Sequence, residues 1–253
     1  MVNNLKKIIL GIAASCALST TVFADSSTVT YEISITNLVN APFLSKPVVA
    51  IHSSNFKLFE LGKVNTSPGL EAVAETGKPT ILADELALNP EVLEVRILNG
   101  ALPNGGLAAG ETVTATFTAS KDFSYVSVYS MIAPSNDGFI SANSVKGPYK
   151  EKSVVIMSPV YDAGTEANNE LCDTAVPTDI NDPDSIPVPP PMRPMICVFN
   201  PTIPAPPFAR VGAGGEGPIL VHRGFQGIGD LNPAMFDWRN PAAKIMIKRI
   251  SSK

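Results

Sequence analysis

Histidine and cysteine, the residues that most often supply bases, nucleophiles and soft metal ligands, are scarce in this chain. Its 253 residues include two histidines and three cysteines. No Gly-x-Ser-x-Gly segment is present to expose a nucleophilic serine, and neither His52 nor His222 stands beside an obvious catalytic partner. Each histidine ends an expected strand, where a packed or solvent-facing role is commoner than a role as base. The sequence therefore predicts a protein that is not an enzyme.

An excess of basic residues is also lacking. The chain has 19 lysines and arginines against 23 aspartates and glutamates, which gives a formal charge of −4. Proteins that bind nucleic acid need clustered lysine and arginine to face the phosphates. The acidic balance therefore argues against a nucleic-acid partner and favours the binding of cations over anions.

Hydrophobic runs long enough to span a membrane are absent. The longest apolar run covers approximately residues 8–20, which is shorter than the roughly 20 residues of a membrane-spanning helix. Two lysines precede this run, and Val22-Phe23-Ala24 follows it. That order is typical of a secretory signal peptide cleaved after Ala24. We expect residues 1–24 to be a signal peptide and residues 25–253 to be exported to the periplasm or the extracellular space.

Cleavage at that point leaves two cysteines, Cys172 and Cys197, and moves the formal charge from −4 to about −6. An even number of cysteines in an exported chain indicates a disulfide. The bond would close a loop of about 25 residues and contribute on the order of 3 kcal/mol by the chain-entropy model. Two unpaired thiols and a thiolate metal site are the alternatives, although the Cys-x-x-Cys spacing of thiolate sites is missing.

What the sequence does contain is strands. Residues Val29 to Asn37 read V-T-Y-E-I-S-I-T-N, which has the two-residue period of a half-buried strand. Similar runs predict further strands at residues 47–52, 92–98, 111–119, 125–131, 153–160, 218–222 and 244–250. Only residues 69–76 have the composition of a helix. We expect an all-β fold, an antiparallel β-sandwich with short helices.

Proline is concentrated in one stretch. Eleven prolines fall between Thr174 and Pro207, three of them in a row. Proline cannot donate a backbone hydrogen bond and favours extended polyproline geometry. Only about 45 residues follow, too few to bury an independent core comfortably. We therefore expect one domain over residues 25–253, with a long surface loop at 174–207 and a return of the last two strands to the sandwich.

Two segments match ligand-binding motifs without their structural setting. Gly212-x-Gly214-x-x-Gly217 has the dinucleotide spacing, but a proline and a strand follow where a helix N-terminus is needed. The acidic run of Asp179, Asp182 and Asp184 lacks the glycine and closing glutamate of a helix-flanked calcium loop. We interpret the first as a flexible turn and the second as a solvated loop.

Two turns carry the candidate metal ligands. Residues 161–170 place Asp162 and Glu166, with two nearby amides, around a glycine that lets the chain turn sharply, and residues 134–138 put Asp137 directly after an expected strand. Strand-end loops at one pole of a sandwich converge, and carboxylate and amide oxygens are the ligands that calcium prefers. The residues alone predict either a cation site at this pole or acidic side chains that only cap the turns.

Stretches over nearly the whole expected mature chain resemble the spondin N-terminal domain, the β-sandwich module of the F-spondin and mindin matrix proteins that also occurs in bacterial exported proteins. The most specific is Tyr161-Asp162-Ala163-Gly164-Thr165-Glu166, and a second is Met131-Ile132-Ala133-Pro134-Ser135-Asn136-Asp137-Gly138-Phe139. The other matching stretches are residues 29–38, 48–53, 58–62, 67–77, 222–224, 229–231 and 237–241.

The resemblance implies a fold similar to the calcium-dependent phospholipid-binding sandwiches and a calcium site built by Asp137, Asp162 and Glu166. Animal members have aspartate where Glu166 stands, and glutamate reaches one methylene further, which keeps bidentate coordination open. The resemblance also implies a non-catalytic binding or adhesion module whose partner is a protein, matrix or a surface glycan.

Two other functions would use the same carboxylates. A calcium-dependent membrane-surface binder would show basic or apolar residues at this pole, and Phe139 and Lys146 are its candidates. A metal-dependent hydrolase would need an open coordination position beside a deep cleft.

Overall fold

The computed structural model describes residues 28–40, 42–150, 152–170, 215, 217–229 and 231–252. The expected signal peptide at 1–24, the expected loop at 174–207 and the expected disulfide between Cys172 and Cys197 lie outside these residues. Within the described ranges, no helix combines the length and hydrophobicity that crossing a membrane requires.

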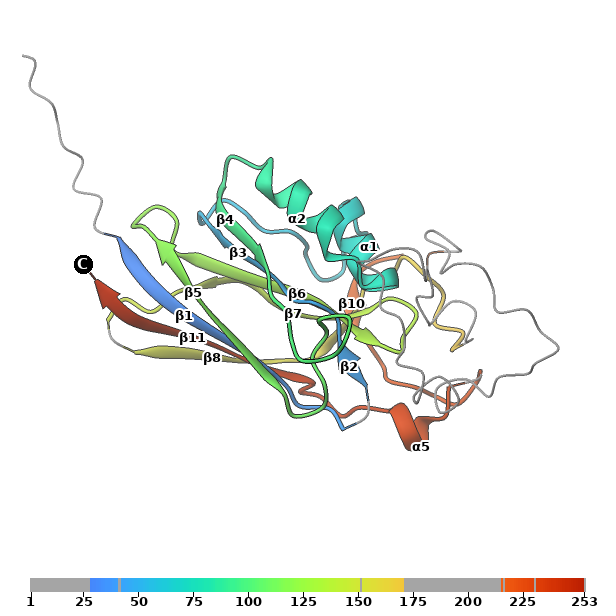
Figure 1. Cartoon of the computed structure of the whole chain (residues 1–253). Helices are drawn as coiled ribbons and strands as arrows, with labels where there is room; N and C mark the ends of the chain where they lie inside the picture. The colour runs from blue at the N-terminus through green and yellow to red at the C-terminus, as the bar shows by residue number, and fades with distance from the viewer. Residues whose placement is uncertain are drawn as a thin grey trace, which may run out of the picture.

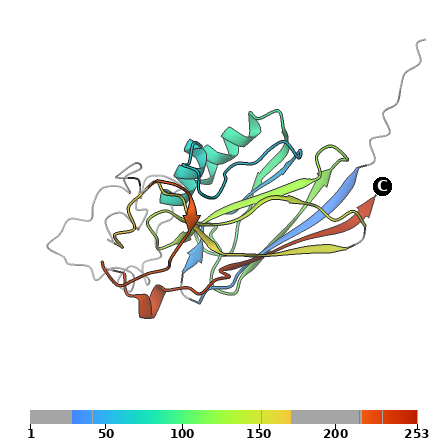
Figure 2. The same cartoon turned by 180° about the vertical axis from the view of Figure 1, so that it is seen from behind.

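Two antiparallel sheets pack face to face as a sandwich (Figures 1 and 2), so the predicted fold class is confirmed. The smaller sheet has the strand order β5-β1-β11-β8; the larger has the order β10-β9-β7-β6-β3-β4, and β2 also pairs with β6. The strands are β1 (Val29–Asn37), β2 (Phe43–Leu44), β3 (Val48–His52), β4 (Val92–Ile97), β5 (Thr112–Ala119), β6 (Tyr125–Ala133), β7 (Gly138–Lys146), β8 (Ser153–Ser158), β9 (Val160–Asp162), β10 (Leu220–Val221) and β11 (Ala243–Ser252).

Helices form a third layer on the outer face of the larger sheet (Figure 1). This layer consists of α1 (Pro68–Thr76) and α2 (Pro79–Ala87), and a short helix, α5 (Pro233–Phe236), lies near one end of the sandwich. Ser67 caps α1 by accepting a hydrogen bond from the Leu70 N–H at 2.9 Å, and Gly77 ends it in the left-handed region at φ 66°. The expected short helices are present, although the composition of the sequence located only α1 and missed α2 and α5.

Two hydrophobic cores follow from this layering. The first lies between the sheets and includes Ile33 and Ile247 of the smaller sheet with Val128 of the larger. The second lies between the larger sheet and the helices, where Tyr129 packs with Leu70 and other helical side chains. The larger sheet is therefore buried on both faces in its centre.

The sequence did not predict β7, a central strand of the larger sheet. Strand β7 (Gly138–Lys146) begins with five buried residues in succession and shows no apolar–polar alternation. Strand β1, by contrast, alternates because one face meets the core and the other is partly exposed. A period of two therefore cannot identify β7. Strands β3 and β6 are as deeply buried and were predicted, since they are rich in valine, isoleucine and tyrosine, whereas β7 contains glycine, alanine, asparagine and two serines.

Strand β11, which follows the proline-rich stretch in sequence, pairs with β1 over the whole length of β1. It also pairs with β8 on its other edge. The segments before and after residues 171–214 therefore share one sheet.

Candidate metal centre

The turn between β6 and β7 positions Asp137. Ser135 closes this turn, because its hydroxyl donates to the Ile132 carbonyl at 2.6 Å and accepts from the Gly138 N–H at 3.0 Å. A Cβ on Gly138 would lie 2.8 Å from the Ser135 oxygen, so the tight turn requires glycine there. Gly138 pairs with Asp162 of β9, which places the two candidate turns side by side.

Asp137 ties these turns together. Its side chain is fully buried, and Oδ2 accepts hydrogen bonds from the Thr165 N–H at 2.8 Å, the Thr165 hydroxyl at 3.3 Å and the Glu166 N–H at 3.1 Å. Its backbone carbonyl accepts from the Ala163 N–H at 3.2 Å. Asp137 Oδ1 is also buried and has no hydrogen-bond partner among the residues that the structure describes. A buried oxygen left this way is unusual and calls for an explanation.

Burial and a neighbouring charge both raise the pKa of the Asp137 carboxyl. Burial is the larger cause, and together with the negative charge of Asp162 it raises the pKa of Asp137 from 3.8 to about 7. The hydrogen bonds from Glu166 and Thr165 act in the opposite direction. The carboxyl therefore changes protonation near neutral pH, and a nearby cation would favour its ionised form.

Asp162 is held from two sides. Its Oδ1 accepts from the Gly164 N–H at 2.8 Å, and its Oδ2 accepts from the Asn168 side-chain amide at 2.5 Å. Gly164 has a φ of +68°, and a Cβ there would lie 2.4 Å from the Gly217 carbonyl oxygen. Glycine at this position thus allows the turn to pack directly against the segment that leads into β10.

Amide side chains extend the contact between the turns. Asn136 Nδ2 donates to Asn169 Oδ1 at 3.1 Å, and Asn136 Oδ1 accepts from the Glu170 N–H at 3.1 Å. Asn136, Glu166 and Asn168 are all buried. The predicted convergence of the two turns is therefore seen in the structure at the level of the backbone and of these side chains.

The donor chemistry of this pole suits calcium. Among the described residues, no three His, Cys, Asp or Glu side chains are grouped closely enough to hold a metal ion. The available atoms are carboxylate, amide and carbonyl oxygens, the hard ligands that calcium uses in numbers of six to eight. Asp137 Oδ1 is the buried oxygen that a cation would engage. The chemical type of these ligands therefore fits calcium. The three expected carboxylates, however, are not gathered around one point.

Glu170 is a buried residue of this region whose role sequence reasoning missed. Its two carboxylate oxygens accept from the Gln226 N–H and, at 3.0 Å, from the Ile228 N–H. Glu170 itself adopts a φ of +58°. It anchors the segment after β10 to the turn after β9, and no local signal marks it because its partners are 56 and 58 residues away.

Both histidines are packed residues in the structure. His52 is buried, and its ring packs against that of Phe56. His222 is buried, its Nδ1 accepts from the Gly224 N–H at 2.9 Å, and its ring lies 4.9 Å from that of Trp238.

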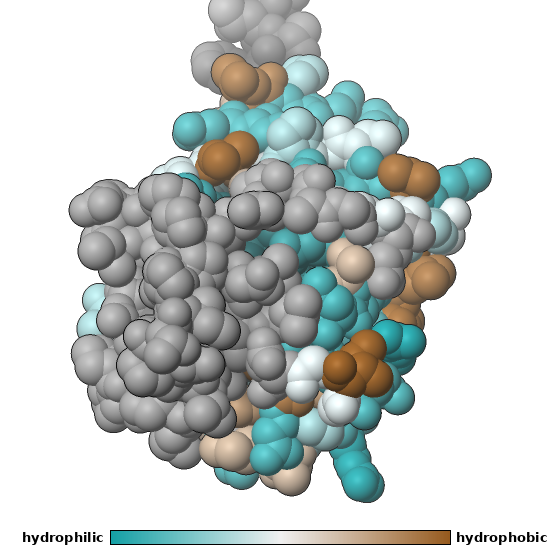
Figure 3. Space-filling view, turned by 90° about the vertical axis from the view of Figure 1, so that its right-hand side faces the viewer, coloured by the Kyte–Doolittle hydropathy of each residue, from teal (hydrophilic) through white to brown (hydrophobic). Residues whose placement is uncertain are grey.

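The residues expected to support membrane binding do not lie at the surface of this pole. Phe139 is fully buried between Phe59 and Tyr161, and Lys146 ends β7 at the far side of the molecule. Figure 3 views the end near β10 and α5, where the described residues are mostly hydrophilic and hydrophobic ones form small separate spots. Other apolar residues near this pole are exposed, among them Leu220 and Val221 of β10, so a membrane-surface role stays a prediction.

Comparison with protein families identifies this architecture. Residues 37–184, more than half of the chain, match the model of the Spondin_N family. The chain belongs to the Spondin_N family. The suspected resemblance is confirmed, and both turns of the candidate centre lie inside the matched range. Spondin domains are extracellular modules of the adhesion type and are generally non-catalytic. No curated protein matches the chain.

Proposed function

We propose that this spondin-domain protein is exported to the periplasm or the extracellular space and acts there as a non-catalytic adhesion module. In this proposal, calcium binds between Asp137, Asp162 and Glu166, and the partner is a protein, matrix or a surface glycan. The observation that carries the calcium assignment is Asp137, whose buried Oδ1 has no hydrogen-bond partner among the described residues.

The electrostatics of the pole support this assignment. Asp137 and Asp162 repel one another, as the raised pKa of Asp137 indicates. A divalent cation would offset that repulsion and supply the missing partner of Asp137 Oδ1. Glu166 would complete the carboxylate set by moving its side chain toward the ion, since the three carboxylates are not grouped at present.

Calcium titration by calorimetry tests the proposal. Wild type, Asp162→Asn and Glu60→Gln are compared at about pH 8, where Asp137 is largely ionised. Glu60 is exposed, so its substitution removes the same charge without touching the centre. We expect heat of binding in wild type and Glu60→Gln and at least a tenfold weaker affinity in Asp162→Asn.

The same ion should also stabilise the fold. A ligand that binds only the native state raises the free energy of unfolding by RT ln(1 + [L]/Kd), about 2.7 kcal/mol at a hundredfold excess over Kd. Absence of both heat and thermal stabilisation at millimolar calcium would reject the site and leave the acidic residues as turn caps.

The expected Cys172–Cys197 disulfide is tested separately. Reduction of the bond should raise the intact mass by two hydrogens, and the free energy of unfolding should fall by roughly 3 kcal/mol. An unchanged mass would favour the two unpaired thiols.

A further inference from the structure

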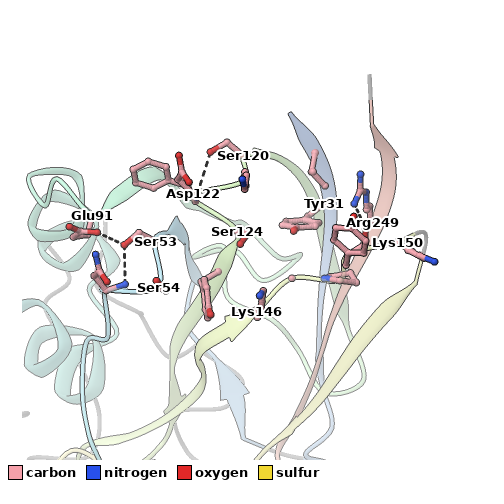
Figure 4. A pocket seen from close by; sticks show the side chains of 18 residues that line it. Tyr31, Ser53, Ser54, Glu91, Ser120, Asp122, Ser124, Lys146, Lys150 and Arg249 are labelled. Atoms are coloured by element: carbon pink, nitrogen blue, oxygen red, sulfur yellow. Dashed lines mark hydrogen bonds between the residues drawn. The ribbon is translucent and has the colours of Figure 1, made fainter. Parts of the chain in front are cut away.

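A large open cavity lies at the end of the sandwich opposite the candidate metal centre. Its volume is about 1070 Å³, and it is formed where β1 begins, where β11 ends and where the β5–β6 and β7–β8 connections meet. In Figure 4, Tyr31 and Arg249 lie on one side, Ser53 and Glu91 on the other, and Lys146 between them. Small-molecule sites commonly have volumes of about 300–1000 Å³. This cavity therefore accommodates a ligand larger than one sugar or one amino acid.

Positive charge predominates in this cavity although the protein as a whole is acidic. Among the lining residues that the structure describes, four are cations, Lys121, Lys146, Lys150 and Arg249, and two are carboxylates, Glu91 and Asp122. None of these four cations makes an ion pair with a residue that the structure describes. Glu91, in turn, accepts a hydrogen bond from the Ser53 hydroxyl across the cavity from Arg249. A concave surface lined by charge of one sign concentrates ligands of the other sign.

Fixed contacts shape the side of the cavity that carries Arg249. Arg249 donates to the Tyr149 carbonyl oxygen, so its guanidinium is attached to the β7–β8 connection. Gly147 lies against the Tyr31 ring so closely that a Cβ would come within 2.4 Å of it. These contacts hold the backbone of the β7–β8 connection in place, and this backbone carries Lys146, Lys150 and Tyr149 at the cavity.

Aromatic and hydroxyl groups make up most of the remaining lining. The rings are Tyr31, Phe123, Tyr125 and Tyr149, and the Tyr149 side chain belongs to a residue that is 85% exposed. Serines and Asn55 add hydroxyl and amide groups, whereas Val29 and Pro148 are the aliphatic side chains among the described lining residues. Peptide sites rely on apolar pockets for anchoring side chains. This lining suits a saccharide better than a peptide. Its rings can stack on the C–H faces of sugars, its polar groups can bind sugar hydroxyls, and its cations can pair with acidic groups.

We infer that this cavity binds an acidic oligosaccharide, one that carries uronate carboxylates or sulfate groups. The lysines and Arg249 pair with the acidic groups, and Tyr149 stacks on a sugar ring. This saccharide site lies at the opposite end of the sandwich from the proposed calcium centre, and saccharide binding does not depend on calcium. Strands β6 and β7 both run from one site to the other, over roughly 26 Å at about 3.3 Å per residue.

Binding is measured by calorimetry with the full mature chain in EDTA. The probes are a sulfated hexasaccharide, an oligogalacturonate, a neutral cello-oligosaccharide and polyglutamate of matched charge. We expect one or both acidic saccharides to bind, with little binding of the neutral saccharide or of polyglutamate. Equal binding of polyglutamate would overturn the inference in favour of an acidic-peptide or general polyanion site, and failure of both acidic saccharides would overturn it outright.

Two variants and one charge-matched control locate the site. Lys146→Gln with Lys150→Gln should weaken binding by about tenfold, because two exposed charge contacts are lost. Tyr149→Ala should weaken it by about fivefold even at high salt, where charge contacts are screened. Lys63→Gln with Lys244→Gln removes the same charge from exposed positions outside the cavity and should leave affinity unchanged.

Asp162→Asn separates the two sites. This substitution should weaken the proposed calcium binding at least tenfold and leave saccharide affinity unaltered. A saccharide affinity that requires calcium, or that falls equally in the Lys63/Lys244 control, would contradict the placement of the site in this cavity.

Discussion

His52 lies at the end of β3 with both ring nitrogens engaged. Nδ1 is 2.7 Å from the Ser53 carbonyl oxygen, and Nε2 is 2.9 Å from the Ser127 hydroxyl. The buried ring packs edge-on against Phe56. Burial lowers the pKa of His52 below its ordinary value of 6.5, although the Ser53 carbonyl acts in the opposite direction. His52 therefore serves the fold as a neutral residue.

Acidification should destabilise the protein through His52. The unfolded chain takes up this proton near pH 6.5 and the folded protein only at lower pH. The stabilising contribution is thus complete above 6.5 and is lost as the pH falls below it. We expect the urea midpoint to fall further in wild type than in His52→Gln between about pH 7.5 and pH 5.5. Parallel falls in the two proteins would assign the effect to other groups.

Glu170 offers a graded test of buried carboxylate hydrogen bonds. Its two oxygens each accept one backbone N–H, from Gln226 and Ile228. Hydrogen bonds to charged groups contribute about 1.5–3 kcal/mol each. Glu170→Gln keeps one acceptor and should cost less unfolding free energy than Glu170→Ala, which leaves both N–H groups without their acceptor. Equal losses in urea denaturation would mean that a single hydrogen bond carries the contact.

At the scale of elements, the link between α1 and α2 depends on Ser67. Its hydroxyl caps α1 and also donates to Glu85 Oε2 at 2.8 Å, an oxygen that the Gly69 N–H reaches at 2.7 Å. Ser67→Ala should lower the free energy of unfolding by about 1–2 kcal/mol. Ser67→Asp keeps a good cap but places a second carboxylate beside Glu85. If Ser67→Asp is as stable as wild type in urea unfolding, the contact with Glu85 contributes nothing.

Most strands could be predicted from the sequence, including β3 and β6, which are almost entirely buried. The alternation of β1 gave its bounds, whereas β7 has neither alternation nor the valine, isoleucine and tyrosine content of β3 and β6. Helix α2 was also missed. It follows α1 after two residues and begins at Pro79 without a side-chain cap, so only its packing against the sheet distinguishes it from a loop.

The same distinction applies to the two sites. Asp137 and Asp162 stand in turns with recognisable composition, so their approach followed from strand-end geometry and from the family resemblance. The contacts of Asp137 with Thr165 and Glu166 required the pairing of β7 with β9. The cavity at the other end collects residues from six separate segments between Val29 and Arg249. A site assembled from such distant segments has no local sequence pattern by which it could be predicted.

At the scale of the whole molecule, the two ends of the sandwich differ in charge. The Asp137 end carries buried carboxylates, and the Arg249 end carries an excess of cations. Their separation of roughly 26 Å exceeds the Debye length of about 8 Å at physiological ionic strength. We therefore expect each end to bind its ligand without a direct electrostatic effect on the other.

The pairing of β1 with β11 makes a prediction about the minimal folding unit. The Spondin_N match ends at residue 184, before β11, yet β11 lies between β1 and β8 in the smaller sheet. A chain of residues 25–184 loses Ile245 and Ile247 from the core and leaves two strands without their ladder partner. We expect it to show no cooperative urea unfolding, in contrast to residues 25–253.

A complementation experiment tests whether the loss of β11 is the reason that residues 25–184 do not unfold cooperatively. A peptide of residues 217–253 supplies β10, α5 and β11, and adding it to the 25–184 fragment should restore the far-ultraviolet strand signal and cooperative unfolding. A peptide with Ile245→Asp and Ile247→Asp would place two charges in the core between the sheets and should not restore either. Cooperative unfolding of the fragment alone would show that the larger sheet with its helices is stable without the closed sandwich.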